Sequence, residues 1–421
     1  MTVSDVISNL LKIISDAVAG FIYSILGAGG VANFVIMLLA ALVLCAGAAL
    51  AFMALTYVER KVVARIQDRF GPNQAGPYGL LQPFADGIKM FTKEDTTPTQ
   101  ADRWVYNFAP LVIAVFALMA YAVFPFAPSV VGTDLNIGVI YVIAVGAGST
   151  VAILMAGWGS NNKYALLGAF RTVAQLVGYE VPMLLNVLPV VMLAGSMSLV
   201  NIVQQQTGAN GAGGIPYILA LPLSALAFLV SGIAETGRSP FDLLEAESEI
   251  VAGFHVEYSG MKFALFFLGE YVNSLAVSLM FSVLFLGGYA GPVLPPYLWL
   301  LIKAGLVFIV LMWLRGTLPR IRVDQLMSLN WKFLVPLSVA NLIVVMVLAK
   351  VFVTNSALAA ANGGIVVAPI VQALILFLAS VGLLLIALTL VAHRARAVRL
   401  VEAEDLERQR LENQIATAAQ S

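Results

Sequence analysis

Nine apolar runs separated by polar loops constrain the fold of this chain more than any other feature. Most of them have the roughly 20 residues that a helix needs to cross a bilayer. Of 421 residues, 60% are hydrophobic and only 11% are charged, and the mean hydropathy is +0.93. These values predict an all-α, polytopic membrane protein with about nine transmembrane helices. The runs lie near residues 34–58, 104–126, 137–157, 172–196, 217–234, 263–288, 297–314, 334–354 and 364–392.

The runs divide the chain into four predicted segments. Residues 1–33 mix apolar side chains with charges and are expected to lie at the membrane interface as an amphipathic segment, not a signal peptide. Residues 34–354 hold eight spans and form the core. Residues 355–392 add one further span, and residues 393–421 form a charged tail with five arginines.

The loops between the spans alternate in charge. Residues 59–103 hold seven Lys or Arg, and further cations follow the third, fifth and seventh spans. The alternate loops hold none; they are 127–136, 197–216, 289–296 and 355–363. By the positive-inside rule, the N-terminus is expected outside and the C-terminus in the cytoplasm. The amphipathic surface helices are then predicted on the cytoplasmic side.

The chain offers few groups that could hold a redox cofactor. Its single cysteine, Cys45, lies inside an apolar run, so an internal disulfide and a thiolate-held metal cluster are excluded. Its two histidines, His255 and His393, are too few and too far apart for a metal site. The sequence has no phosphate-binding loop and no basic-aromatic patch for nucleic acid. Any flavin, iron–sulfur cluster or metal is therefore expected in another chain.

The stretch from Ser231 to Tyr271 concentrates acids between two apolar runs, with seven carboxylates against two cations. Its residues 239–242, SPFD, resemble a helix start, with a hydroxyl at the N-cap and proline at the first helical position. On such a helix Glu245 and Glu249 share a face, and their crowding couples their titrations so that the group can hold a proton. A solvated acidic loop is the alternative, but acids at membrane depth are costly and usually functional.

Two further acids lie inside predicted spans. Glu180 precedes Pro182 by two residues. Because the proline removes the donor for the carbonyl of Gly178, the helix should kink close to the acid. Glu270 has Asn273 about one turn further on as a potential partner. A protonated, hydrogen-bonded Glu would also fit, but a kinked helix with a carboxylate at membrane depth is better suited to a proton relay.

Basic loops on the same side are candidates for a binding surface. Residues 59–69 continue the first span at helical spacing, and residues 80–93 resume an amphipathic helix with Asp86 and Lys89 three residues apart. The loop at 315–332 is rich in arginine and ends in a tryptophan and a lysine. Each loop could be an anchor in the lipid headgroups, or a platform for a polar head group or a docked subunit.

Four long charged blocks occur in order over about residues 34–354, with transmembrane spans between them. They are ERKVVARIQDRFGPNQAGPYGLLQPFADGIK, GWGSNNKYALLGAFRTVAQLVGYE, ETGRSPFDLLEAESEIVAGFHVEYSGMKFALFFLGEY and RGTLPRIRVDQLMSLNWK. Together they resemble the family of H subunits of bacterial proton-pumping NADH–quinone oxidoreductase, respiratory complex I. The chain departs from that family at its C-terminus, because members usually end after eight spans.

The resemblance implies a quinone chamber shared with the peripheral arm and a coupling of quinone reduction to proton translocation, with no activity alone. Quinone (ubiquinone or menaquinone) is then the substrate. The implied partners are peripheral-arm subunits B, D and I, membrane subunits A, J and K, and lipid of the bacterial inner membrane. The positions that match the chamber are Glu59, Arg60, Arg65, Asp86, Lys89, Phe254 and Arg322. The positions that match the proton path are Glu180, Glu235, Asp242, Glu245, Glu247, Glu249, Glu257 and Glu270.

Three other functions fit parts of the sequence. A membrane subunit of a proton-pumping hydrogenase is related, but its acidic block is generally less complete than the run ETGRSPFDLLEAESE here. A stand-alone cation or proton transporter would use broken helices in two matching halves, and no such repeat is found. A purely structural anchor for the peripheral arm leaves Glu180 and Glu270 without a role.

Overall fold

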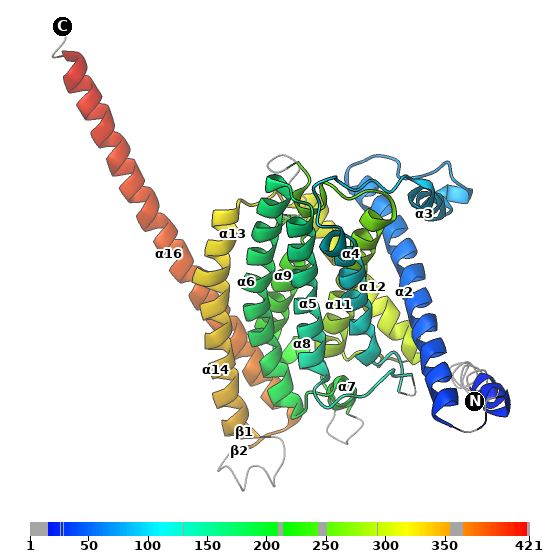
Figure 1. The fold of residues 1–421 in the computed structure, drawn as a ribbon. Helices are drawn as coiled ribbons and strands as arrows, with labels where there is room; N and C mark the ends of the chain where they lie inside the picture. The colour runs from blue at the N-terminus through cyan, green and yellow to red at the C-terminus, as the bar shows by residue number, and fades with distance from the viewer. Residues whose placement is uncertain are drawn as a thin grey trace.

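Figure 1 shows the chain as a bundle of long helices that run roughly side by side, with short helices and loops at both ends. This computed structural model describes residues 16–418 apart from 26, 28, 129, 209–213, 243–250, 293 and 354–364, and no side chains beyond residue 394. Loops rich in cations, including those around α3 (Gln82–Thr92) and α13 (Val323–Leu329), lie at one end of the bundle. That end is called the basic end below.

Eight of the nine predicted runs form helices that are long and apolar enough to span a membrane. They are α2 (Gly30–Ile66), α4 (Arg103–Met119, continued by η2, Ala120–Val123), α5 (Gly138–Gly159), α6 (Lys163–Ala194), α11 (Gly260–Phe285), α12 (Pro296–Thr317), α13 with η4 (Asn330–Leu334) and α14 (Val335–Val351), and α16 (Pro369–Ala418). The described strands are only a short parallel pair, β1 (Phe352–Val353) and β2 (Ile365–Val366). The predicted all-α membrane fold is confirmed.

The run at 217–234 differs from its prediction. It forms α8 (Tyr217–Ala220) and α9 (Pro222–Glu235), which meet at Leu221, where the backbone has φ −125° and ψ 57°. Pro222 explains the break, because proline has no N–H and disfavours the helical conformation in the residue before it. At 1.5 Å per residue α9 is about 21 Å long, shorter than the hydrocarbon core of roughly 30 Å. The run predicted at 217–234 is therefore helical but is divided into two helices by a break.

Short helices cover the two ends of the bundle. At the basic end α3 forms the amphipathic helix predicted at 80–93, preceded by η1 (Pro77–Gly79), and η3 (Gly253–His255) lies between α9 and α11. A short apolar helix, Asp16–Ile25, precedes α2, and α7 (Leu199–Thr207) lies at the opposite end. Residues 1–15, which hold much of the predicted N-terminal segment, lie outside the described residues.

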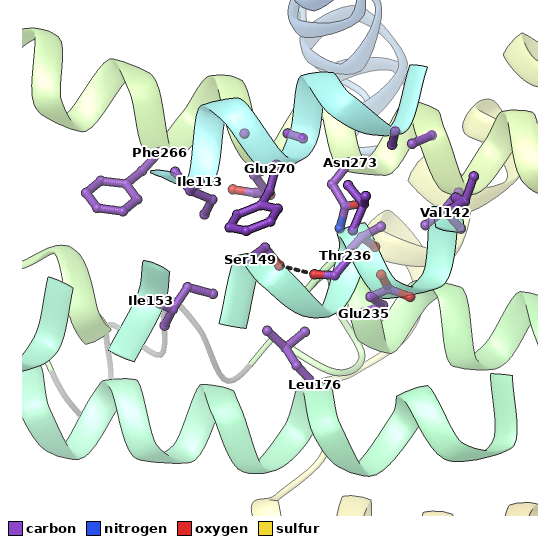
Figure 2. Close-up of a pocket in the computed structure, with 18 of the residues that line it drawn as sticks. Ile113, Val142, Ser149, Ile153, Leu176, Glu235, Thr236, Phe266, Glu270 and Asn273 are labelled. Atoms are coloured by element: carbon purple, nitrogen blue, oxygen red, sulfur yellow. Dashed lines mark hydrogen bonds between the residues drawn. The ribbon is translucent and has the colours of Figure 1, made fainter. Parts of the chain in front are cut away.

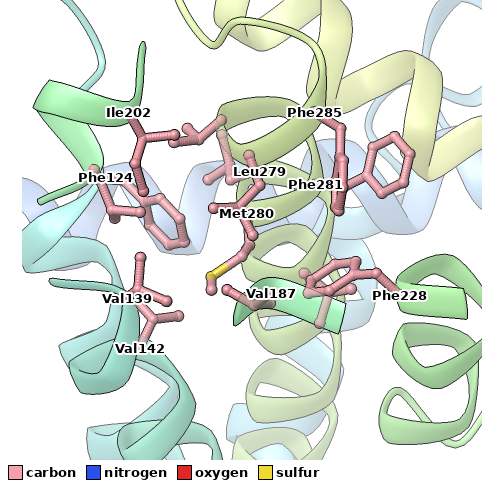
Figure 3. Packing of buried hydrophobic residues seen from close by; sticks show 14 of the residues in the cluster. Phe124, Val139, Val142, Val187, Ile202, Phe228, Leu279, Met280, Phe281 and Phe285 are labelled. Atoms are coloured by element: carbon pink, nitrogen blue, oxygen red, sulfur yellow. The ribbon is translucent and has the colours of Figure 1, made fainter. Parts of the chain in front are cut away.

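The core is centred on α11. Figure 3 shows buried side chains such as Val142, Val187, Phe228 and Phe281 packed in one cluster. In the most apolar part of α11, 61% of the residues are buried, against 6% in α2 and 11% in α16. α11 is therefore a central helix and α2 stands at the edge. α16, the additional C-terminal span, packs on α8, α9 and α14 and continues beyond the bundle at the basic end (Figure 1).

Candidate functional site

A cavity lies between α4, α5, α6, α9 and α11. Its walls are mostly apolar, with Ile113 and Leu176 among them, but Glu235, Glu270 and Asn273 also line it. Figure 2 shows these three polar side chains around one space, contributed by α9 and α11. The cavity has a volume of about 70 Å³, and a water needs only about 10–15 Å³. The arrangement can therefore hold a short chain of water between two acids, and it is called the acid cavity below.

The ends and turns of two helices place these acids. Glu235 is the last residue of α9, and Glu270 lies in α11 with Asn273 almost one turn further on. The sequence suggested Asn273 as a partner of Glu270, and the structure gives its side chain a hydrogen bond to Glu235. Gly146 of α5 lies against the same carboxylate, and a Cβ there would come within 3.0 Å of Glu235 Oε1. The glycine therefore leaves room for the acid.

Glu180 approaches the acid cavity from α6. Leu176 and Met183, about one turn away on either side of it, both line the cavity, so the three residues share a face of the helix. The charge of Glu180 interacts with that of Glu235. Three of the predicted proton-path acids are thus brought into one region of the bundle; they are Glu180, Glu235 and Glu270.

Arg238, which the sequence did not mark as a site residue, connects the acid cavity to α2. Its guanidinium is 1% exposed and pairs with Glu59 of α2 and with Glu270, at N···O distances of 3.1 and 3.9 Å. Arg315 of α12 forms a second ion pair with Glu59. A carboxylate predicted for the quinone chamber and one predicted for the proton path therefore share a buried cation.

Aromatic rings hold Arg238 in this position. Its Cζ lies 4.8 Å from the centre of the Tyr271 ring and 5.3 Å from that of Phe308, both within range for cation–π attraction. Its Nε, Nη1 and Nη2 atoms make no hydrogen bond to any described residue. The guanidinium is thus held between the two carboxylates by charge and by the ring faces.

The residues predicted for the quinone chamber do not meet in a single pocket. Arg60 of α2 forms an ion pair with Asp86 of α3, with 2.5 Å between Nη1 and Oδ2, on the surface of the basic end. The other three cations predicted for the chamber are also exposed at this end; they are Arg65, Lys89 and Arg322. These residues form an open, charged surface rather than an enclosed site.

Two of the predicted chamber residues are buried inside the bundle instead. Glu59 is buried beside Arg238. Phe254 is buried in η3, packs edge-on against Phe266 with ring centres 5.3 Å apart, and lines the cavity. The sequence could not separate these two from the surface group, because all seven positions were selected by resemblance.

The remaining predicted acids lie in the loop after α9. Glu257 Oε1 accepts a hydrogen bond from Asn162 Nδ2 at 2.7 Å, and Asp242 is half-buried. The other three, Glu245, Glu247 and Glu249, lie outside the described residues.

The helix start predicted at 239–242 was wrong for those residues, which form turns. The Phe241 N–H donates to the Arg238 carbonyl at 2.9 Å, and the Pro240 carbonyl accepts from the Ile321 N–H at 3.0 Å. Contacts with the loop before α13 therefore replace the local helical pattern, and they fix the turn that carries Arg238.

Comparisons with known proteins identify the family. A family model described as NADH dehydrogenase matches residues 39–346. The chain is 53% identical over 288 residues to the H subunit of the NADH-quinone oxidoreductase of Dehalococcoides mccartyi (strain CBDB1), covering 68% of this chain and 80% of the relative. It is 47% identical over 322 residues to an H subunit from Syntrophobacter fumaroxidans, covering 74% and 96%.

A third relative, the H subunit from Rickettsia prowazekii, is 45% identical over 312 residues, covering 72% of this chain and 89% of the relative. The family match ends within α14, so α16 lies beyond it. The resemblance carried by the four charged blocks is thereby confirmed. The chain belongs to the family of NADH–quinone oxidoreductase H subunits, which are membrane subunits of respiratory complex I.

Proposed function

We propose that this chain forms part of the quinone chamber of its complex and couples quinone reduction to proton translocation through the acid cavity. The observation that carries the proposal is the sharing of Arg238 between Glu59 and Glu270. If the charge of Glu59 changes, its attraction for Arg238 changes as well. The electrostatic interaction between Arg238 and Glu270 is then altered too. In a buried site such an interaction is screened far less than at the surface.

The chemistry of the substrate supplies the charge change. A quinone that takes up two electrons must also take up two protons, and nearby cations and acids stabilise the charge that develops. When Glu59 changes its protonation or its pairing, Arg238 shifts toward Glu270. The carboxylates of Glu270, Glu235 and Glu180 then exchange protons through water in the acid cavity. Each pKa unit of such a shift corresponds to about 1.4 kcal/mol, so a few contacts suffice to bias the path.

Other subunits complete the site. The exposed cations at the basic end include Arg65, Lys89 and Arg322, and they suit a surface where peripheral-arm subunits B, D and I dock. Those subunits carry the electrons, since this chain offers no thiolate set for a cluster. Membrane subunits A, J and K would continue the proton path away from the acid cavity. In this arrangement the basic end faces the cytoplasm.

Glutamine substitutions in the assembled complex test the proposal. The variants Glu180→Gln, Glu235→Gln and Glu270→Gln are compared in proteoliposomes, with NADH and a short-chain quinone as substrates and a pH-sensitive dye as readout. We expect proton uptake per NADH to fall several-fold in at least one of them. Glu94→Gln, at an exposed position of the basic end, is the control. Normal uptake in all three acid variants would refute the proton-path role.

A further inference from the structure

A proline in the middle of α6 leaves one backbone carbonyl without its helical donor. Pro182 has no N–H, so the carbonyl of Gly178 cannot make the usual bond four residues along the helix. The side chain of Asn330 supplies the missing donor, with 2.6 Å between its Nδ2 and Gly178 O. Asn330 is fully buried. A buried carbonyl without a donor is destabilising, and this single bond replaces the one that the proline removes.

The contact is specific in its geometry. With the amide turned round, Asn330 Oδ1 would face the Gly178 carbonyl oxygen, so the contact requires the NH₂ group on this side. A Cβ at position 178 would lie 3.0 Å from Asn330 Nδ2, so glycine lets the donor approach. The next residue, Tyr179, donates from its hydroxyl to the carbonyl of Leu326 at 3.1 Å. One turn of α6 is thus attached twice to the segment that contains Asn330.

Asn330 stands where the helix geometry of the partner segment changes. It is the first residue of η4, the π-helical turn between α13 and α14. Such turns insert an extra residue into a helix and often occur at functional sites. The turn therefore sets the rotation at which the amide of Asn330 meets α6.

Glu180 directly follows the two anchored residues of α6, Gly178 and Tyr179, and precedes Pro182 by two residues. The path of the helix through this turn determines where its carboxylate stands relative to Glu235. We propose that Asn330 is a positioning residue, which holds the proline-interrupted turn of α6 so that Glu180 faces the acid cavity. This inference rests on the proposed function and adds a residue that acts through Glu180.

The proline itself provides the test. In Asn330→Leu the side chain keeps a similar volume but loses its donor, and we expect proton uptake per NADH to fall by about twofold or more, as for other residues that act on a site indirectly. In the double variant Asn330→Leu, Pro182→Ala, the new backbone N–H at 182 can bond Gly178 O, so uptake should return. Pro182→Ala alone should pump normally, because the carbonyl then has two potential donors.

A second buried asparagine provides the matched control. Asn341 of α14 is also fully buried, but its Nδ2 donates to Ser224 Oγ at 2.7 Å and not to a carbonyl of α6. Asn341→Leu should therefore leave the uptake per NADH unchanged even if it lowers the amount of complex. Two outcomes would overturn the proposal and indicate that Asn330 acts through packing alone. One is an equal loss of proton uptake per NADH in Asn330→Leu and Asn341→Leu, and the other is a double variant Asn330→Leu, Pro182→Ala that does not recover uptake.

The two proposals fail in different ways. If Asn330→Leu pumps normally while Glu180→Gln does not, Asn330 has no positioning role and the proton path stands. If Glu180→Gln pumps normally, the proposed role of Glu180 fails whatever Asn330 does. Should Asn330→Leu alone not assemble, the double variant decides: normal uptake supports the positioning role and reduced uptake overturns it.

Discussion

Glu59 and Arg60 are neighbours in α2, yet they belong to two different regions of the molecule. The Glu59 side chain is 7% exposed and pairs with the buried Arg238 and with Arg315. The Arg60 side chain is 50% exposed and pairs with Asp86 at the surface. Successive residues of an α-helix point about 100° apart, so one faces the bundle and the other faces outward. Position in the sequence alone does not separate a buried charge network from a surface of charges.

The difference in burial determines what the two groups of charges can do. Between buried groups a change of charge acts at low effective dielectric and reaches the next group with little loss. Exposed pairs are screened by water and salt within about 8 Å, so they transmit little and serve better as contacts for an incoming partner. The network around Arg238 is thus suited to coupling, and the surface of the basic end to docking.

Among the substitutions that test the difference between buried and exposed charges, removal of Arg238 should have the largest effect on stability. Arg238→Met keeps a long apolar side chain between Tyr271 and Phe308 but leaves Glu59 and Glu270 without their shared cation. Breaking a buried pair typically costs about 3–5 kcal/mol. We expect a marked fall in the thermal midpoint and yield of the complex, measured by native gel and activity loss on heating. Arg69→Met, at an exposed position, should stay within about 1 kcal/mol of wild type, and an equal loss there would contradict the distinction.

The sequence predicted most of the fold because hydropathy and length alone locate a membrane span. The hydropathy pattern did not show the break that Pro222 makes in the run at 217–234. The helix start predicted at 239–242 was wrong, because the Pro240 carbonyl there accepts a hydrogen bond from the Ile321 N–H. The first difference comes from a proline within the run itself. The second comes from a hydrogen bond to a distant part of the chain, which a local pattern does not report.

The candidate site shows the same limit. Acids could be selected from sequence because charge inside an apolar run is conspicuous, but Arg238 lies in a loop of mixed charge, and its partner Glu59 is far away in the chain. The ion pair between Arg315 and Glu59 joins residues 256 positions apart. For Asn330 a signal existed, because Pro182 shows that some donor must serve Gly178. Only the packing of α13 and η4 on α6 reveals which residue it is.

A pH change should distinguish His255, which lines the acid cavity, from an exposed histidine. Burial lowers the pKa of His255 to about 4, against about 6.5 in an unfolded chain. Below pH 6.5 this histidine binds a proton in the unfolded state but not in the native state. The native state therefore loses stability as the pH falls from 6.5 to about 4. At pH 5.5 the loss is about 1.4 kcal/mol. His255→Gln should reduce the fall in the thermal midpoint of the complex between pH 7.5 and 5.5.

The control for that experiment is His393→Gln, at an exposed position of α16, which should keep the wild-type pH dependence. If the His255 and His393 variants lose stability equally on acidification, His255 is not held neutral by its surroundings. His255 would then behave like the exposed His393.

The smallest expected effect concerns the surface pair itself. In a double-mutant cycle with Arg60→Met and Asp86→Asn, the coupling energy from thermal midpoints should be about 0.2–1 kcal/mol, and it should shrink further when salt is raised from 0.05 to about 0.5 M. The same cycle on Glu59→Gln and Arg315→Met should give a larger coupling that salt changes little, since Glu59 is buried. Equal couplings with equal salt dependence would mean that burial does not separate the two regions. In that case a charge change near Arg60 would reach the interior as readily as one at Glu59, and the route through Arg238 would lose its advantage.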